Sequence, residues 1–330
     1  MGTVRKPFVG ITYQDADITN DVTYFLLNFT YTDKITGSSP SIEMELEDRE
    51  KIWQNEWFPS TSARISAFFQ YFGEGGRLDV KDFEIDLLEF SFDNGGDKFT
   101  IGAQQTPFSK NLREKRSQEY ENITLSDLIT LIATRQGLTS IGSVFAITFK
   151  RITQNEESDL EFLTRLSEDY GHLFKIQGNQ IINYLWQDLD EQPADFTLTR
   201  KEITSFSATK KLSGIYKGVN LVYFVGGDQA IGAFIKAERE NNSSDILVIN
   251  ERAESLSEAQ AKAKEKLRKA NAEEWSGDLV VEGEFWQIAG INFNIKGFGR
   301  FDGVWQIQEI DHSFSSDGWV ASMKIFRIRE

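Results

Sequence analysis

Residue types that could bind phosphate or transfer protons gather between Gly297 and Phe314, in the stretch GFGRFDGVWQIQEIDHSF. A Gly-x-Gly, an arginine, an Asp-Gly pair and His312 are the parts of a phosphate loop. Such a loop must lead into a helix, because the helix N-terminus supplies the amides that bind the anion. Here the glycines lead into VWQIQEI, which alternates as a strand does. We therefore interpret Gly297, Gly299 and Gly303 as turn and bulge positions.

Other catalytic or metal-binding patterns are sparse. The two histidines, His172 and His312, are far apart in the chain and there is no cysteine, which argues against a zinc site. No Gly-x-Ser-x-Gly elbow of a serine hydrolase occurs. Glu282 and Glu284 share one face of a predicted strand and are spaced as paired glycosidase carboxylates would be, but 51 acidic residues make such pairs common. We predict no catalytic residue, no metal and no cofactor, and thus no enzyme.

The composition favours strands and disfavours some partners. Aromatic residues make up 13% of the 330 residues, and aromatic side chains prefer strands. A net charge of −15 argues against direct binding to nucleic acid or an anionic membrane, and no apolar run is long enough to cross a bilayer. The lack of cysteine indicates a reducing compartment, and no secretory signal is recognisable. We expect assembly in the cytoplasm. The basic stretch 109–116 is interpreted as a solvated linker, with a phosphate-binding patch as the alternative.

The first part of the chain predicts antiparallel strands. Residues 41–48 alternate strictly, with Glu43, Glu45 and Glu47 on the face opposite the apolar one. In residues 82–92 the alternation slips by one residue at Leu87–Leu88, which predicts a β-bulge.

The middle of the chain predicts helices and a hairpin. Residues 124–137 and 158–171 have helical spacing, and Ser158 with Glu161 forms a capping box. A hairpin is expected over 173–186, with its turn at Gly178–Asn179. A third helix is expected over 257–274, with Ser257 in a second capping box. The domains predicted from these patterns are a β-module at 1–112, a small α+β domain at 113–195, and a second β-module at 196–330 with a helical insert at about 250–275.

The two ends of the chain resemble each other. Residues 77–96 align with residues 300–318 if one insertion is allowed, and each copy follows a strand and a glycine turn. The matched pairs are Arg77 and Arg300, Leu78 and Phe301, Asp79 and Asp302, Phe83 and Trp305, Ile85 and Ile307, Leu88 and Ile310, Ser91 and Ser313, and Phe92 and Phe314. We infer an internal duplication, with hairpins of similar length as the alternative explanation.

Two motifs resemble a known family. The segment SDLEFLTRLSEDYGHLFKI (158–176) resembles the S-D-x-x-F-L-x-R-L-x-x-x-x-G segment of the phage late-control protein D family. The run from Gly283 to Ile328 resembles the end of the same family, with its G-x-G-x-F-D-G turn, D-H-S-F and last strand. These are baseplate hub proteins of contractile tails and injection systems, similar to the hub part of VgrG. The matched positions are Ser158, Asp159, Phe162, Leu163, Gly171, Gly297, Gly299, Phe301, Asp302, Gly303 and His312.

The resemblance implies a symmetry adaptor. Hub proteins of this family form trimers in which each chain supplies two tube-like β-barrels, so that three chains join a threefold spike to a sixfold inner tube. It implies as partners two further copies of the chain, a spike protein, an inner tube or tube-initiator protein and other baseplate proteins, in the virion or particle baseplate. We expect no fused spike, and Glu43, Glu45 and Glu47 facing the channel. Whether the particle is a phage or phage-derived stays open. The alternatives are a β-rich carbohydrate-binding module, with exposed Trp or Tyr, and a cell-wall glycosidase.

Overall fold

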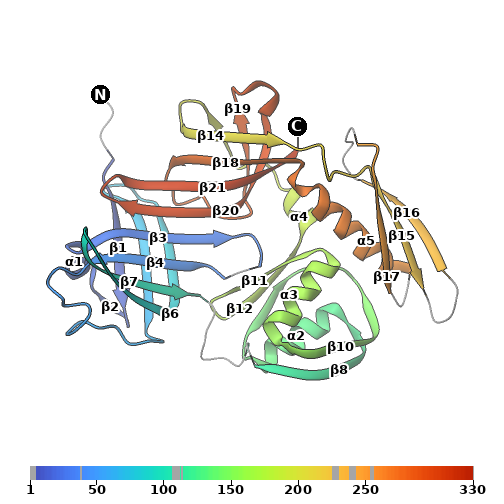
Figure 1. Cartoon of the computed structure of the whole chain (residues 1–330), viewed down its shortest axis with the longest axis horizontal. Coiled ribbons are helices and arrows are strands. Elements are labelled where there is room, and N and C mark those ends of the chain that lie inside the picture. The colour runs from blue at the N-terminus through green and yellow to red at the C-terminus, as the bar shows by residue number, and fades with distance from the viewer. Residues whose placement is uncertain are drawn as a thin grey trace.

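The computed structural model describes residues 5–37, 39–105, 112, 114–224, 230–237, 243–252 and 256–329. Figure 1 shows the blue strands of an N-terminal module, the red strands of a C-terminal module above them, a green α+β domain below, and an orange helix beside three strands at the right. The mainly β fold with an α+β insert is confirmed. Most of the basic stretch 109–116 lies outside the described residues. In the described part of the chain, no helix has the length and apolar character needed to cross a membrane.

The N-terminal module is a run of antiparallel strands in the spatial order β3-β4-β7-β6-β5-β1. The bounds are β1 (Pro7–Tyr13), β2 (Ala16–Asp17), α1 (Thr19–Thr23), β3 (Leu26–Lys34), β4 (Ser41–Glu47), β5 (Arg64–Tyr71), β6 (Arg77–Asp93) and β7 (Gly96–Gln104). In β4, Ile42, Met44 and Leu46 are buried, as the alternation predicted. Their core includes Phe29, Phe69 and Phe83, all fully buried.

The C-terminal module has a similar strand order, β14-β18-β21-β20-β19-β13, but β13 runs parallel to β19, whereas β1 runs antiparallel to β5. The bounds are β13 (Phe196–Thr199), β14 (Ile203–Lys210), β18 (Trp275–Glu282), β19 (Asn292–Lys296), β20 (Gly303–Ser315) and β21 (Gly318–Arg329). The core of this module surrounds the fully buried side chains of Phe293, Trp305 and Ile307.

Both modules belong to one sheet of 13 strands, because β20 pairs with β3. The long strand β20 has two partners on the same side: β19 along its first residues and β3 along its last. Among the described residues, no strand pairing joins the two ends of the sheet, so the sheet is open. The closure of each module into a barrel is therefore not confirmed.

The α+β domain lies between the two modules in sequence. It contains β8 (Lys115–Thr124), α2 (Leu125–Arg135), β9 (Thr139–Gly142), β10 (Thr148–Ser158), α3 (Asp159–Tyr170), β11 (His172–Gln177), β12 (Gln180–Leu185) and α4 (Trp186–Asp190). The predicted helices and hairpin are confirmed. Thr124 caps α2, and Ser158 with Glu161 forms the predicted capping box of α3. Leu128, Phe162 and Leu166 face a core of this domain's own.

The insert in the C-terminal module is larger than the helix predicted at about 250–275. Strands β15 (Gly218–Phe224), β16 (Ala230–Lys236) and β17 (Ile246–Arg252) form a separate sheet, and α5 (Leu256–Asn271) packs on it. The helix begins at Leu256, so Ser257 lies inside it and the predicted capping position is wrong. Tyr170 of α3 donates a hydrogen bond to Glu258 of α5 (3.0 Å), which ties the insert to the α+β domain.

Candidate assembly interface

The glycine-rich stretch that opened the sequence analysis is a turn. The Asp302 carboxylate accepts hydrogen bonds from the backbone amides of Gly297 (3.1 Å) and Phe298 (2.6 Å). Gly297 and Gly299 have φ values of +95° and +66°, which glycine adopts without strain. The chain then enters β20 directly. Since these amides are already bonded and no helix of useful length follows, the stretch has no phosphate-loop geometry.

His312 is a buried structural residue at the junction of the modules. The indole N–H of Trp319 donates to His312 Nδ1 (3.1 Å), so the proton of the neutral ring is on Nε2, which donates to the Gln287 carbonyl (2.8 Å). The ring also stacks against Tyr31 of β3. Burial lowers the pKa of His312 to about 4. The imidazole therefore joins strands of both modules and has no free nitrogen for chemistry.

The predicted carboxylate pair is held by an arginine. Arg5 donates to Glu284 (2.6 Å) and to Glu74 (2.7 Å), lies 3.4 Å from Glu282, and stacks over the Tyr71 ring. The hydrogen bonds that Arg5 donates to Glu74 and then to Glu284 raise the pKa of Arg5, so its charge is permanent. A glycosidase needs its two carboxyl groups free to face a sugar. Arg5 was not foreseen, because its partners lie far along the chain.

We expect Glu284→Gln to lower the free energy of unfolding by about 1 kcal/mol, because a charge-assisted hydrogen bond to Arg5 is lost. The urea midpoint measures this change. Glu282→Gln is the control, since Glu282 is 57% exposed and should matter little. Loss of a measured cell-wall hydrolysis in Glu284→Gln at unchanged stability would contradict the structural role and favour the glycosidase alternative.

His172 lies at the end of α3, directly after Gly171, which adopts a φ of +69° at the helix C-cap. Its side chain is 2% exposed, and burial lowers its pKa to about 4 from an ordinary value of 6.5. It lines a cleft of about 600 Å³ beside α5, together with Glu265 and Arg268, which pair with each other (2.5 Å). Among the described residues, no group of three metal-ligating side chains is placed to hold an ion.

The depressed pKa of His172 predicts a pH dependence of stability. Between pH 6.5 and 4 the unfolded chain binds a proton at this residue that the folded chain does not, so stability falls as pH falls through this range. The loss is about 3 kcal/mol by the usual conversion. His172→Leu should lose less stability than the parent between pH 6.5 and 4, measured by urea unfolding. Equal losses of stability in the two proteins would contradict the prediction, because they would show that folding does not lower the pKa of His172.

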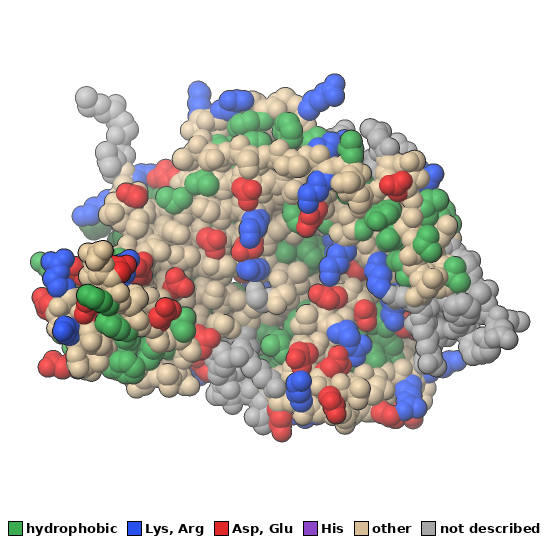
Figure 2. All heavy atoms as spheres, viewed as in Figure 1, with side chains coloured by type: hydrophobic (Ala, Val, Ile, Leu, Met, Phe, Trp, Pro, Cys, Tyr) green, Lys and Arg blue, Asp and Glu red, His purple; other side chains and the backbone are tan. Residues whose placement is uncertain are grey.

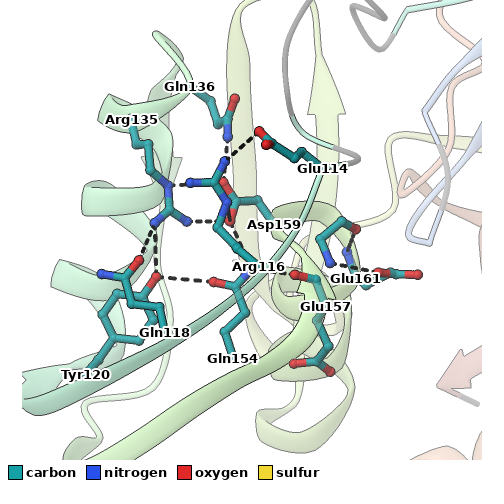
Figure 3. Close-up of polar contacts among 11 residues, drawn as sticks. Glu114, Arg116, Gln118, Tyr120, Arg135, Gln136, Gln154, Glu157, Asp159 and Glu161 are labelled. Atoms are coloured by element: carbon teal, nitrogen blue, oxygen red, sulfur yellow. Dashed lines mark hydrogen bonds and ion pairs between the residues drawn. The ribbon is translucent and has the colours of Figure 1, made fainter.

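The family motif at the start of α3 is organised around a buried carboxylate. Asp159 is fully buried and accepts hydrogen bonds from Gln136 (2.6 Å) and Gln154 (3.0 Å) and from the Arg135 guanidinium. Figure 3 shows these groups converging on Asp159 from α2, β8 and β10. Arg116 lies 3.8 Å away. The carboxylate thus binds four elements together, and Phe162 and Leu163 on the same helix fill the core.

The three glutamates predicted to line a channel lie on one face of β4, away from the core. Glu43 is exposed, while Glu45 and Glu47 are half-buried. Glu45 pairs with Lys98 (2.7 Å) and Glu47 with Arg49 (2.6 Å). On the face of the molecule shown in Figure 2, acidic and basic side chains are interspersed.

The two modules repeat one pairing register. In the hairpin β6–β7, Leu88 pairs with Ile101, and in β20–β21 the matched Ile310 pairs with Met323. The tight turns match too, as Asp93 pairs with Gly96 and Ser315 with Gly318. The pairings with the adjacent strands also match between the two modules. The matched pairs are Met44–Ile101 with Leu279–Met323, Phe29–Met44 with Phe206–Leu279, and Ile65–Phe83 with Phe293–Trp305.

Irregularities recur at matched positions as well. The predicted bulge in β6 is confirmed between Ile85 and Leu87, and β20 has a bulge between the corresponding Ile307 and Glu309. A second bulge, between Leu26 and Asn28 in β3, recurs between Ile203 and Ser205 in β14. Hairpins of similar length need not share bulges, because a bulge is a specific one-residue insertion. The repetition therefore supports the duplication inferred from sequence.

Comparison with known proteins gives sequence relatives for about half of the chain. The chain is 27% identical over 183 residues to the probable baseplate hub protein of Escherichia phage 186, and 28% identical over 184 residues to that of Escherichia phage P2. Each match covers 55% of this chain and 46% of the relative. The chain thus spans about half the length of the curated relatives it matches. No family model matches the sequence.

Solved structures share the fold across nearly the whole chain. A tail protein from Neisseria meningitidis covers 98% of this chain and 97% of its own, with a TM-score of 0.72 at 11% identity. A 43 kDa tail protein of prophage MuSo2 from Shewanella oneidensis covers 97% of both chains, with a TM-score of 0.68 at 13% identity. A chain of the Francisella PdpA-VgrG complex matches 98% of this chain and 53% of its own, with a TM-score of 0.58 at 9% identity.

These comparisons confirm the resemblance predicted from sequence. The fold is that of phage tail and VgrG-type proteins, and the sequence is similar to proteins named as baseplate hubs. Asp302, His312 and Asp159 are three of the positions matched to the family in the sequence. In the structure each of these side chains holds parts of the fold together.

Proposed function

We propose that the chain is a structural baseplate hub of a contractile phage tail or a related injection particle. It acts as a trimer that joins a threefold spike to a sixfold inner tube, with other baseplate proteins bound around it. Its role is mechanical and not enzymatic. Support comes from the similarity to named baseplate hub proteins and from the shared fold of phage tail and VgrG proteins.

The observation that carries this proposal is the repetition of one five-strand antiparallel arrangement in a single chain, β3-β4-β7-β6-β5 and β14-β18-β21-β20-β19, with matched registers and bulges. A closed ring of three chains would contain six such modules. A ring of this kind offers six similar surfaces to a tube and three identical ones to a spike. A single-function binding module has no need of two matched copies joined edge to edge.

The polar faces of the modules would line the channel of this ring. Glu43 and Asp278 occupy matched positions: Glu43 pairs with Thr30, and Asp278 pairs with the corresponding Ser207. Both carboxylates are exposed on the face opposite their core. An acidic channel repels the phosphates of passing DNA and so limits adhesion.

Electron microscopy of the chain mixed with its candidate spike protein tests the proposal. We expect rings with three copies of the chain, sixfold features on one side and the spike on the other. Particles with a single copy of this chain bound to the spike would contradict the adaptor role.

A further inference from the structure

The intramolecular junction between the modules provides a template for a junction between chains. At that junction the last part of β20 pairs with β3, from Glu309 opposite Lys34 to Ser315 opposite Asn28. Because five strands of each module match in register, β6 in the N-terminal module corresponds to β20, and β14 in the C-terminal module corresponds to β3. Since β20 and β3 pair with each other, we expect β6 and β14 each to pair with another strand in the same way.

Among the described residues, neither of these two edges has such a partner. Strand β6 pairs with β5 only from Arg77 to Glu84, and no described strand pairs with that side from Leu87 to Asp93. Strand β14 pairs with β18 and is the end of the described sheet. In Figure 1, β14 lies at the top of the molecule and β6 lies below β3 and β4. The first edge is the part of β6 beyond its pairing with β5, and the second is the terminal strand β14.

The free part of β6 exposes large apolar side chains. Phe90 is 48% exposed and Phe92 is 75% exposed. His312, which corresponds to Phe90, is fully buried at the junction with β3. An exposed apolar strand edge is a site for pairing with another chain.

We propose that Leu87–Asp93 of β6 pairs antiparallel with Ser205–Lys211, which includes most of β14, of a second copy of this chain. The register follows from the template: Phe92 lies opposite Phe206, Ser91 opposite Ser207 and Leu87 opposite Lys211. This inference rests on the proposed trimer, and it names the strands that close it.

The residues at the proposed junction suit the template. At the internal junction Phe314 pairs with Phe29, and in the proposed register Phe92 meets Phe206, so the aromatic pair is kept. Ser313 pairs with Thr30, and Ser91 would meet Ser207, which again places two small polar side chains together. The template ion pair of Lys34 with Glu309 (3.4 Å) is not kept, because its counterparts are Lys211 and Leu87, and Lys211 pairs with Glu273 of its own chain (2.6 Å).

The proposed contact also allows a closed ring. Each chain would offer the β6 edge to one neighbour and the β14 edge to the other, so the contact is head-to-tail and a rotation can close it into a ring. With the internal junction alternating with the proposed one, three chains form a continuous circle of six modules.

Disulfide trapping tests the register directly, because the chain has no native cysteine. The variant S91C/S207C places two exposed positions opposite each other, within the Cβ separation that a disulfide spans. Oxidation should shift the band on a non-reducing gel from one chain to covalent dimers and trimers. The control S91C/T209C moves one cysteine two residues along the strand, to a diagonal separation that a disulfide does not span. The control should stay at the gel position of a single chain.

The mass in solution under reducing conditions is measured in parallel. A trimer that gives no cross-link in S91C/S207C, or cross-links equally in the control, would overturn the proposed register and leave the hub function standing. A cross-link within one chain would also overturn it. A monomer without cross-links, both alone and with the candidate spike, would overturn both the register and the proposed trimer.

Discussion

Replacing Asp159 with alanine should lower the free energy of unfolding by about 3 to 5 kcal/mol, because the buried amides of Gln136 and Gln154 and the half-buried Arg135 guanidinium lose their shared acceptor. Gln136 and Gln154 are buried, so water cannot replace the lost acceptor there, and Arg135 loses the carboxylate that it contacts. The effect spreads through four elements, since these partners come from α2 and β10, and Arg116 of β8 faces the same carboxylate. Urea unfolding followed by circular dichroism measures the change.

Glu119→Ala is the matched control for this prediction. Glu119 also pairs with an arginine, Arg151, in the same domain, but both side chains are more than half exposed. An exposed ion pair contributes about 0 to 1 kcal/mol to the free energy of unfolding. If the two variants lost similar stability, the buried network would not be what organises the α+β domain.

Replacing Phe92 with aspartate should abolish the trimer and leave the monomer folded. The side chain is 75% exposed in the single chain, so the fold does not depend on it. At the proposed junction it would be buried against Phe206 of the neighbour. Losing that burial costs about 1.5 to 3 kcal/mol at each junction, which is roughly a 10- to 100-fold weaker contact, and three such contacts close the ring. Light scattering over a dilution series measures the loss.

Phe72→Asp is the control for this variant. Phe72 is 79% exposed, directly after β5, and lies outside the edge from Leu87 to Asp93. It should therefore keep the trimer. A trimer that survives Phe92→Asp, or is lost equally in both variants, would contradict an interface at this edge.

Local patterns in the sequence were enough to predict most of the elements. The strict alternation in β4, the capping box of α3 and the bulge after Ile85 each depend on residues that are neighbours along the chain. The matched hairpins were visible because the aromatic and aliphatic positions repeat. The hub-like fold followed from these and from the motif around Asp159.

Contacts between residues far apart in the chain could not be predicted from the sequence. The pairing of β20 with β3 joins residues from the two ends of the chain, and alternation alone does not say which edges meet. The ion pairs of Arg5 with Glu74 and Glu284, and of Lys175 with Asp33, depend on the finished fold. The sheet of β15 to β17 was missed because only the helix that covers it has a strong periodic pattern.

The mass of the purified chain in solution, by light scattering alone and with its candidate spike, tests the central claim most directly. The proposed adaptor predicts a species near three times 37.7 kDa, formed by the chain alone or on adding the spike. A monomer under both conditions would contradict a symmetry adaptor. Glycan binding would then be tested next, beginning with the exposed Tyr24 and Trp57.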